Sequence, residues 1–136
     1  KRLYSILKPE DKTKHSITVS RIQDVDLSTF DTLHAGDLLF IDSTHVSKTG
    51  SDVNFVLFEI LPRLKAGVYV HFHDIFHPFE YPYTWVKGKG FGWNENYILK
   101  AFLQYNSHFQ IEYFGHYIIT KEAEWVRNHM PMMLNN

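Results

Sequence analysis

The sequence has 136 residues, of which 44% are hydrophobic and 21% are charged, and these proportions are typical of one globular domain. The net charge of −1 does not favour binding to nucleic acid or to an anionic membrane, and the lack of cysteine excludes disulfides and thiolate metal sites. No apolar run approaches the roughly 20 residues that a membrane-spanning helix needs. We therefore expect a soluble, cytoplasmic protein with no nucleic-acid partner and no membrane partner.

The first half of the chain alternates between helix and strand patterns. An apolar cluster over residues 2–8 has helical spacing and is followed by a charged turn. Apolar and polar side chains alternate over residues 15–22, which predicts a strand, and residues 27–33 predict a short helix. Four consecutive apolar residues at 38–41 predict a strand that is buried on both faces, as in a parallel sheet.

The alternation continues after a polar loop. Ser51 is a suitable helix cap, and the apolar residues that follow predict a helix as far as Leu64. Residues 68–72 predict a second buried strand. Asn94 can cap another helix, which we expect to end at Tyr105.

The chain then changes pattern. Residues 109–114 and 116–120 are apolar segments with only Gly115 between them, which is too short for a parallel crossover and predicts an antiparallel hairpin. A short helix is expected around Trp125, and we treat residues 131–136 as a tail.

This order of elements predicts an α/β fold. Helices that alternate with buried strands imply a mostly parallel sheet with helices on both faces, to which the hairpin adds a final antiparallel strand. Such a three-layer, Rossmann-like sheet binds ligands beyond the carboxyl ends of its strands. Because the series starts with a helix, we expect residues 1–130 to be the C-terminal part of one larger domain, truncated at its N-terminus.

Three local strings carry a resemblance to a known family. Residues 37–45 (DLLFIDSTH), 67–74 (GVYVHFHD) and 109–120 are similar to the later strands of class I S-adenosylmethionine-dependent methyltransferases. The nearest branch is the small-molecule O-methyltransferase-like one, which includes proteins related to cephalosporin biosynthesis. The resemblance implies S-adenosylmethionine as cofactor and a small-molecule acceptor. The family's glycine-rich cofactor loop has no counterpart in this sequence, so we expect the isolated chain to bind cofactor poorly.

Two carboxylates follow the two buried strands. Asp42 and Asp74 each stand where a strand ends, and adjacent parallel strands lie about 5 Å apart, so both side chains could share one hard cation. We therefore expect Asp42, His73 and Asp74 to be candidate ligands of Mg²⁺, as in the metal-dependent members of this fold. Asp42 could instead contact the amine of the cofactor or cap the next turn.

Other polar residues lie near these strand ends. His45 is a candidate general base because the pKa of histidine lies near neutral pH, although the sequence slightly favours a loop histidine bonded to the backbone. In the family, the corner that Gln23 and Asp24 occupy meets the adenine ring, so both are candidate cofactor-binding residues. Asp24 could instead cap the helix near residue 27.

Two alternative functions remain. The run His71, His73, Asp74 and His77 is similar to the metal ligands of zinc hydrolases, although its spacing differs by one position at the acid and at the last histidine. The chain could also be a non-catalytic, methyltransferase-like interaction module.

The long segment 75–93 is a further feature that could serve a catalytic or an interaction function. It holds seven Phe, Tyr and Trp residues among prolines and glycines, which speak against regular structure. It could form a lid over the acceptor, a cluster packed on its own domain, or a contact in a homo-oligomer.

Overall fold

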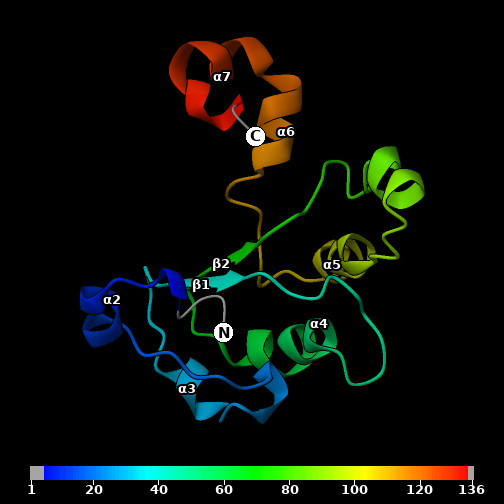
Figure 1. Cartoon of the computed structure of the whole chain (residues 1–136). Coiled ribbons are helices and arrows are strands. Elements are labelled where there is room, and N and C mark those ends of the chain that lie inside the picture. The colour runs from blue at the N-terminus through cyan, green and yellow to red at the C-terminus, as the bar shows by residue number, and fades with distance from the viewer. Residues whose placement is uncertain (1–4, 135–136) are drawn as a thin grey trace.

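The structure, a computed structural model, describes residues 5–134 and is built around a sheet of two strands (Figure 1). The strands β1 (Leu38–Ile41) and β2 (Tyr69–Phe72) lie at the centre, and helices α3 (Ser28–Asp31) and α4 (Asp52–Phe55) lie below them in this view. The remaining helices are α2 (Pro9–Lys14), α5 (Glu95–Gln104), α6 (Gly115–Lys121) and α7 (Ala123–His129), with 3-10 turns at Ile22–Asp24, Leu61–Arg63 and Pro131–Leu134.

The two strands are parallel, as the buried apolar runs predict. Leu38 pairs with Tyr69 and Ile41 with Phe72, so both strands end at the same edge. At the opposite edge the backbones before the strands approach closely, and Gly36 N–H donates to the Gly67 carbonyl at 2.8 Å. A Cβ on Gly67 would lie 2.7 Å from the Cβ of Ala35, and the φ of Gly67 is +86°, so only glycine suits this position.

The two faces of the sheet differ sharply. Alternate residues along each strand point to opposite faces. One face packs on the core, whose members come from α3, β1, the helix after Ser51 and α5: Phe30, Ile41, Val53, Val56, Leu57, Ile60, Leu61 and Leu99. On the other face, Phe40 and Tyr69 are each 56% exposed. The expected third layer is therefore not shown by the described residues.

The helix predicted from Ser51 to Leu64 is present but irregular. Ser51 caps it, since its side chain accepts a hydrogen bond from Asn54 N–H. The α-helical first turn widens to a π-helix over Val56–Ile60 and tightens to a 3-10 turn at Leu61–Arg63. Pro62 explains the change, because proline has no N–H to donate and its ring clashes with the preceding turn.

The segment 75–93 contains more structure than its prolines and glycines suggested. Residues Thr84–Gly88 form a short π-helical turn, with the rest irregular. Helix α5 follows, and it begins at Glu95 and ends at Gln104, close to the predicted bounds. The Asn94 side chain does not cap α5 but bonds to the backbone of Ser47.

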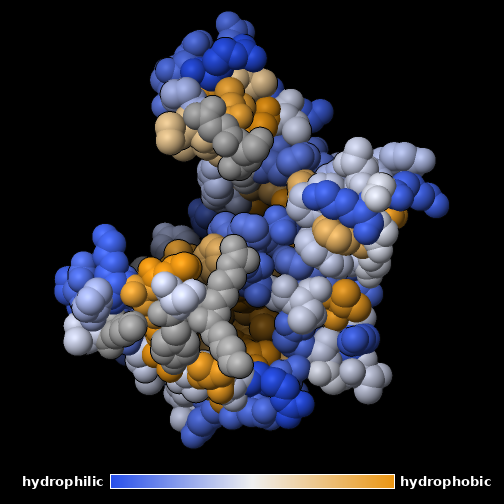
Figure 2. All heavy atoms as spheres, in the orientation of Figure 1, coloured by the Kyte–Doolittle hydropathy of each residue, from blue (hydrophilic) through white to orange (hydrophobic). Residues whose placement is uncertain are grey.

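The predicted C-terminal hairpin is wrong. Residues 109–114 form no strand, and residues 116–120 lie inside the helix α6. The final antiparallel strand is therefore absent from the described residues, whereas the helix expected around Trp125 is present as α7. The two helices pack on each other away from the sheet, and Figure 2 shows hydrophobic residues at their surface, at the top of the view.

The predicted N-terminal strand is also wrong. Residues 15–21 form neither helix nor strand and lead into the 3-10 turn Ile22–Asp24, while the charged turn after residue 8 is the helix α2. Of the helix expected over residues 2–8, residues 2–4 lie outside the described residues, and residues 5 and 6 are helical. Within residues 5–134, no helix combines the length and apolar character needed to cross a bilayer.

Candidate active site at the strand ends

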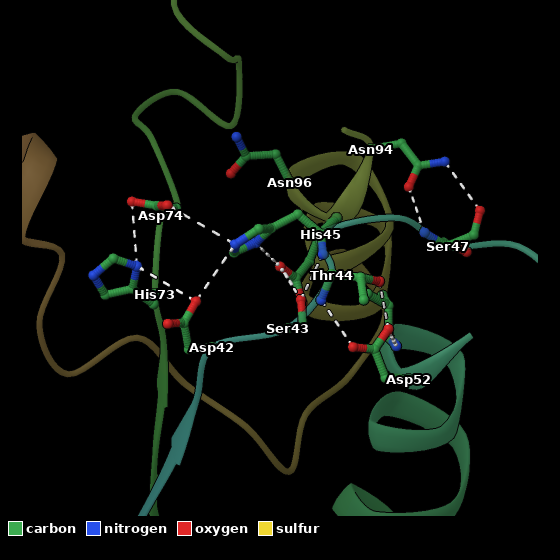
Figure 3. Close-up of polar contacts among 12 residues, drawn as sticks. Asp42, Ser43, Thr44, His45, Ser47, Asp52, His73, Asp74, Asn94 and Asn96 are labelled. Carbon is green, nitrogen blue, oxygen red and sulfur yellow. Dashed lines mark hydrogen bonds and ion pairs between the residues drawn. The ribbon is translucent and has the colours of Figure 1, made fainter. Parts of the chain in front are cut away.

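The structure brings Asp42 and Asp74 to the same edge of the sheet. The strands end side by side at Ile41 and Phe72, and His73 N–H donates to the Ile41 carbonyl at 2.9 Å. The His73 Nδ1 atom lies 3.3 Å from Asp74 Oδ1 and 3.9 Å from Asp42 Oδ1. We call Asp42, His45, His73 and Asp74 the rim, and Figure 3 shows their side chains turned toward one another.

His45 lies between the two carboxylates. Its Nε2 atom is 3.6 Å from Asp42 Oδ1 and 3.8 Å from Asp74 Oδ2, and the residue is only 5% exposed. Its φ is +58°, a left-handed conformation that is uncommon for residues other than glycine. Left-handed residues of this kind concentrate at functional sites.

The other nitrogen of His45 meets a buried carboxylate that the sequence did not reveal as a site residue. His45 Nδ1 lies 2.7 Å from Glu95 Oε2, and the Ser43 hydroxyl lies 2.9 Å from each carboxylate oxygen of Glu95. Burial raises the pKa of Glu95, while the hydrogen bonds from His45 and Ser43 act against that rise. The acid directly after Asn94 was visible only as a favourable charge in the first turn of a helix.

The loop that carries His45 is fixed at both ends. Asp52, in the first turn of α4, accepts hydrogen bonds from the Thr44 backbone N–H at 2.8 Å and from its hydroxyl at 2.6 Å. Burial pushes the pKa of Asp52 upward, but the bonds from Thr44 and from the backbone outweigh it, and the pKa is lowered. At the other end, Asn94 and Ser47 exchange two hydrogen bonds. These bonds fasten the loop to the starts of α4 and α5.

Asn96 lies in the next position along α5 from Glu95 and is completely buried. Its Oδ1 accepts a hydrogen bond from Phe76 N–H at 3.1 Å, which sets the orientation of the amide, yet Nδ2 has no partner in the described chain. Figure 3 labels this side chain on α5. Its backbone N–H donates to the Tyr81 hydroxyl, and burial raises the pKa of Tyr81 to about 12.

The aromatic residues of segment 75–93 pack on one another and against the rim. Phe91 and Trp93 stack with ring centroids 4.6 Å apart, and Trp85 meets both at their edges. Trp93 lies 4.1 Å from the His45 ring, so it covers one face of the imidazole. The segment forms the packed cluster that was one of its three interpretations, and its use as a lid or a homo-oligomer contact stays a prediction.

Gln23 and Asp24 do not reach the rim. Gln23 donates to the Gly50 carbonyl at 2.9 Å, and Asp24 forms an ion pair with Arg21 at 2.8 Å, whose hydrogen bond lowers the pKa of Asp24. Gln23 lines a hollow of about 210 Å³ beside α4. A second hollow of about 270 Å³ lies along α5 and is lined by Ser47, Asn94, Tyr97, Ile98 and Ala101. Neither hollow is lined by a rim residue.

The histidines proposed for zinc hydrolysis are not arranged around a common metal-binding position. His71 stacks on Phe40 at 4.7 Å on the exposed face of the sheet, and the His77 ring meets Tyr117 at 4.9 Å. Across residues 5–134, no three His, Asp or Glu side chains are placed so that they could hold a metal ion. The structure thus supports neither the hydrolase nor the expected metal ligands Asp42, His73 and Asp74.

A comparison with known proteins bears on this site. Residues 8–75, half of the chain, match a family model described as "methyltransferase domain". The matched segment includes β1, β2 and all four rim residues but ends before Glu95. Neither a curated protein nor a solved structure matches the chain.

Proposed function

Because the chain belongs to this methyltransferase domain family, we propose that it takes part in methyl transfer from S-adenosylmethionine to a hydroxyl group of a small molecule. The observation that carries the proposal is the position of His45, whose Nε2 faces the open ends of two parallel strands between Asp42 and Asp74. In sheets of this kind, ligands bind beyond the carboxyl ends of the strands.

The charges of the rim suit this cofactor. S-adenosylmethionine carries a sulfonium and an ammonium cation, and the Asp42 side chain is 61% exposed at the strand end. Within residues 5–134, the only basic side chains within 4 Å of the Asp42 and Asp74 carboxylates are histidines, so no lysine or arginine neutralises them. Asp42 would hold the ammonium group by charge-assisted hydrogen bonds. The unpaired Nδ2 of Asn96 is a further donor that a bound polar group could satisfy.

The reaction needs a base that removes the hydroxyl proton of the acceptor. Bound S-adenosylmethionine would supply an electrophilic methyl group, whose bonding electron pair stays on sulfur when the methyl carbon bonds to oxygen. His45 takes the acceptor's proton on Nε2. Trp93 and the contacts of Thr44 with Asp52 keep the imidazole in position, which avoids the loss of rate that a misplaced base causes.

We further propose that this chain acts within a larger catalytic domain of the O-methyltransferase-like branch. Parallel sheets are normally covered on both faces, but here Leu38, Phe40 and Tyr69 stay exposed on one face. The glycine-rich loop of the family has no counterpart in the sequence. Both observations support a cofactor cradle that is completed by other parts of a full-length protein.

The test is made on the full-length protein. S-adenosylhomocysteine is titrated by calorimetry, with and without Mg²⁺, and methyl transfer is measured with a panel of sugars, alcohols and phenols. His45→Ala should lower kcat about 10²–10⁴-fold because the change removes the base, while S-adenosylhomocysteine still binds because Asp42 is kept. The control is His108→Ala, which removes an exposed histidine outside the rim. Unchanged turnover in His45→Ala would exclude His45 as the base.

A further inference from the structure

We infer that Glu95 is the positioning residue of this site: it fixes His45 in the form that carries a proton on Nδ1 and leaves the Nε2 lone pair at the rim. The inference rests on the proposed function for the role of Nε2 as a base. The form of the imidazole itself can be measured without any turnover.

The first support is the geometry of the pair. The 2.7 Å distance between His45 Nδ1 and Glu95 Oε2 is that of a charge-assisted hydrogen bond. An ionised carboxylate can only accept, so Nδ1 must donate and therefore carries the proton. In the neutral imidazole, Nε2 is then left as the acceptor.

The second support is that Glu95 is itself held in one orientation. The Ser43 hydroxyl lies 2.9 Å from both carboxylate oxygens of Glu95. The hydroxyl oxygen of Ser43 also accepts a hydrogen bond from the His45 backbone N–H at 2.9 Å. Glu95 is 1% exposed, so water does not compete for it. Ser43, His45 and Glu95 therefore form one closed network in which the carboxylate cannot turn away from the ring.

The third support comes from the backbone. The His45 carbonyl accepts the N–H groups of Asn94 at 3.0 Å and Glu95 at 3.2 Å, at the start of α5. The two residues are thus joined by main-chain and side-chain bonds, although 50 positions separate them in sequence. This double connection explains how His45 is kept in its left-handed conformation.

The fourth support is what surrounds Nε2. Its nearest carboxylate oxygens, on Asp42 and Asp74, lie at 3.6 and 3.8 Å, beyond the 2.7–3.2 Å that is typical of hydrogen bonds. Within the described chain, Nε2 therefore makes no hydrogen bond that would occupy its lone pair. Nδ1, which has a hydrogen-bond partner in Glu95, therefore points inward, whereas Nε2, which has none, points toward the strand ends.

The competing explanation is structural. A buried Glu–His pair could serve only to fasten the loop to α5. Asn94 offers a matched comparison, because it fastens the same loop to the same end of α5 through Ser47 but does not touch the imidazole. A purely structural role for Glu95 predicts that Glu95→Gln and Asn94→Ala have the same consequences.

The experiment is ¹⁵N NMR of the imidazole nitrogens in the full-length protein. His116 is an internal reference, because its Nδ1 accepts a hydrogen bond from His77 N–H and so must be in the opposite form, protonated on Nε2. In the wild type we expect His45 to carry its proton on Nδ1. In Glu95→Gln we expect a mixture of the two forms, because an amide can donate to Nδ1 or accept from it. Asn94→Ala should leave the form unchanged.

Turnover separates positioning from folding. With a compound that is methylated in the acceptor panel, Glu95→Gln should lower kcat at least ~10-fold with an unchanged KM for S-adenosylmethionine, whereas Asn94→Ala should keep the wild-type kcat. If Glu95→Gln does not fold, Ser43→Ala tests the same network: the carboxylate is still an acceptor, so His45 should stay protonated on Nδ1, but the loss of the hydroxyl that holds the carboxylate should lower kcat below that of Asn94→Ala.

The possible outcomes are distinct. A wild-type His45 that is protonated on Nε2, or a Glu95→Gln variant that behaves like Asn94→Ala in both measurements, would overturn the inference. A wild type that shows the Nδ1 form dependent on Glu95 but no methyl transfer would remove the proposed function and leave the inference about Glu95 standing.

Discussion

The start of α5 and the α6–α7 pair are two helical regions that are stabilised in opposite ways. The first turn of α5 contains the buried residues Glu95 and Asn96, and it is bonded to loop residues 45 and 47. The pair α6–α7 packs on itself and on Pro131–Leu134, and Trp125 on it is 48% exposed. The comparison indicates that the chemistry of this chain depends on contacts between distant segments, whereas its C-terminal part depends mainly on local ones.

The largest expected effect tests whether the two regions unfold together. Leu99→Ala removes a buried core side chain of α5 and should lower the free energy of global unfolding by about 2–5 kcal/mol. Val126→Ala removes a fully buried side chain of α7 and should mainly promote local opening of α6–α7. Chemical denaturation and hydrogen exchange measure the two quantities. An equal loss of global stability in both variants would show that the regions form one cooperative unit.

An intermediate effect concerns the stability of the α5 region as a function of pH. Burial raises the pKa of Glu95 above its unfolded value of 4.5. An acid with a raised pKa contributes most to folding below its unfolded pKa, and this contribution is lost as the pH rises through the folded pKa. The stability of the wild type relative to Glu95→Gln should therefore decrease as the pH rises above 4.5.

Paired denaturation curves of the two proteins between about pH 4 and pH 8 provide the measurement. The difference between Asn94→Ala and the wild type should stay constant over the same range, since Asn94 does not titrate. A relative stability that instead increases with pH would mean that hydrogen bonds from His45 and Ser43 outweigh burial.

The smallest expected effect lies where the C-terminal pair meets the rest of the chain. Burial, with a smaller contribution from His77, lowers the pKa of His116 below 6.5. A histidine with a lowered pKa contributes to stability above its unfolded pKa, and this is lost as the pH falls through the folded pKa. The His77 N–H donates to His116 Nδ1, and protonation removes that acceptor.

The protection of the His77 amide against hydrogen exchange should therefore decrease as the pH falls below 6.5. His116→Ala should show low protection at every pH, which distinguishes the bond itself from a general loosening of the region. Protection that does not depend on pH in the wild type would show that this contact does not connect the two parts.

Secondary structure was predicted correctly where the sequence pattern was compatible with only one kind of element. Four consecutive apolar residues before Asp42, and the mostly apolar residues 68–72, identified both strands, and parallel pairing then predicted that Asp42 and Asp74 would lie at one edge. The prediction for residues 109–120 was wrong because a short apolar segment fits both the helical and the strand periodicity. A strand also needs a neighbouring strand with which to pair. Among residues 5–134, no strand lies next to the residues around Gly115, and they form the helix α6 instead.

Glu95 could not be found in this way. Its partner His45 lies 50 positions earlier, and their contact depends on how the left-handed loop residue and the first turn of α5 pack. The aromatic segment was recognised by composition, but the contact between the Trp93 and His45 rings follows from the fold alone. The loop spacing therefore revealed the candidate base, and only the folded chain revealed the residue that orients it.

The close approach of Gly67 to Ala35 has a consequence for protein engineering. This contact lies at the far edge of the sheet, where a side chain at position 67 would push the start of β2 away from β1. Asp42 and His73 follow directly after the four paired residues of the same two strands. A library designed to change acceptor preference should therefore keep Gly67 constant. A side chain there would change the distance between the Asp42 and Asp74 carboxylates although no rim residue had been replaced.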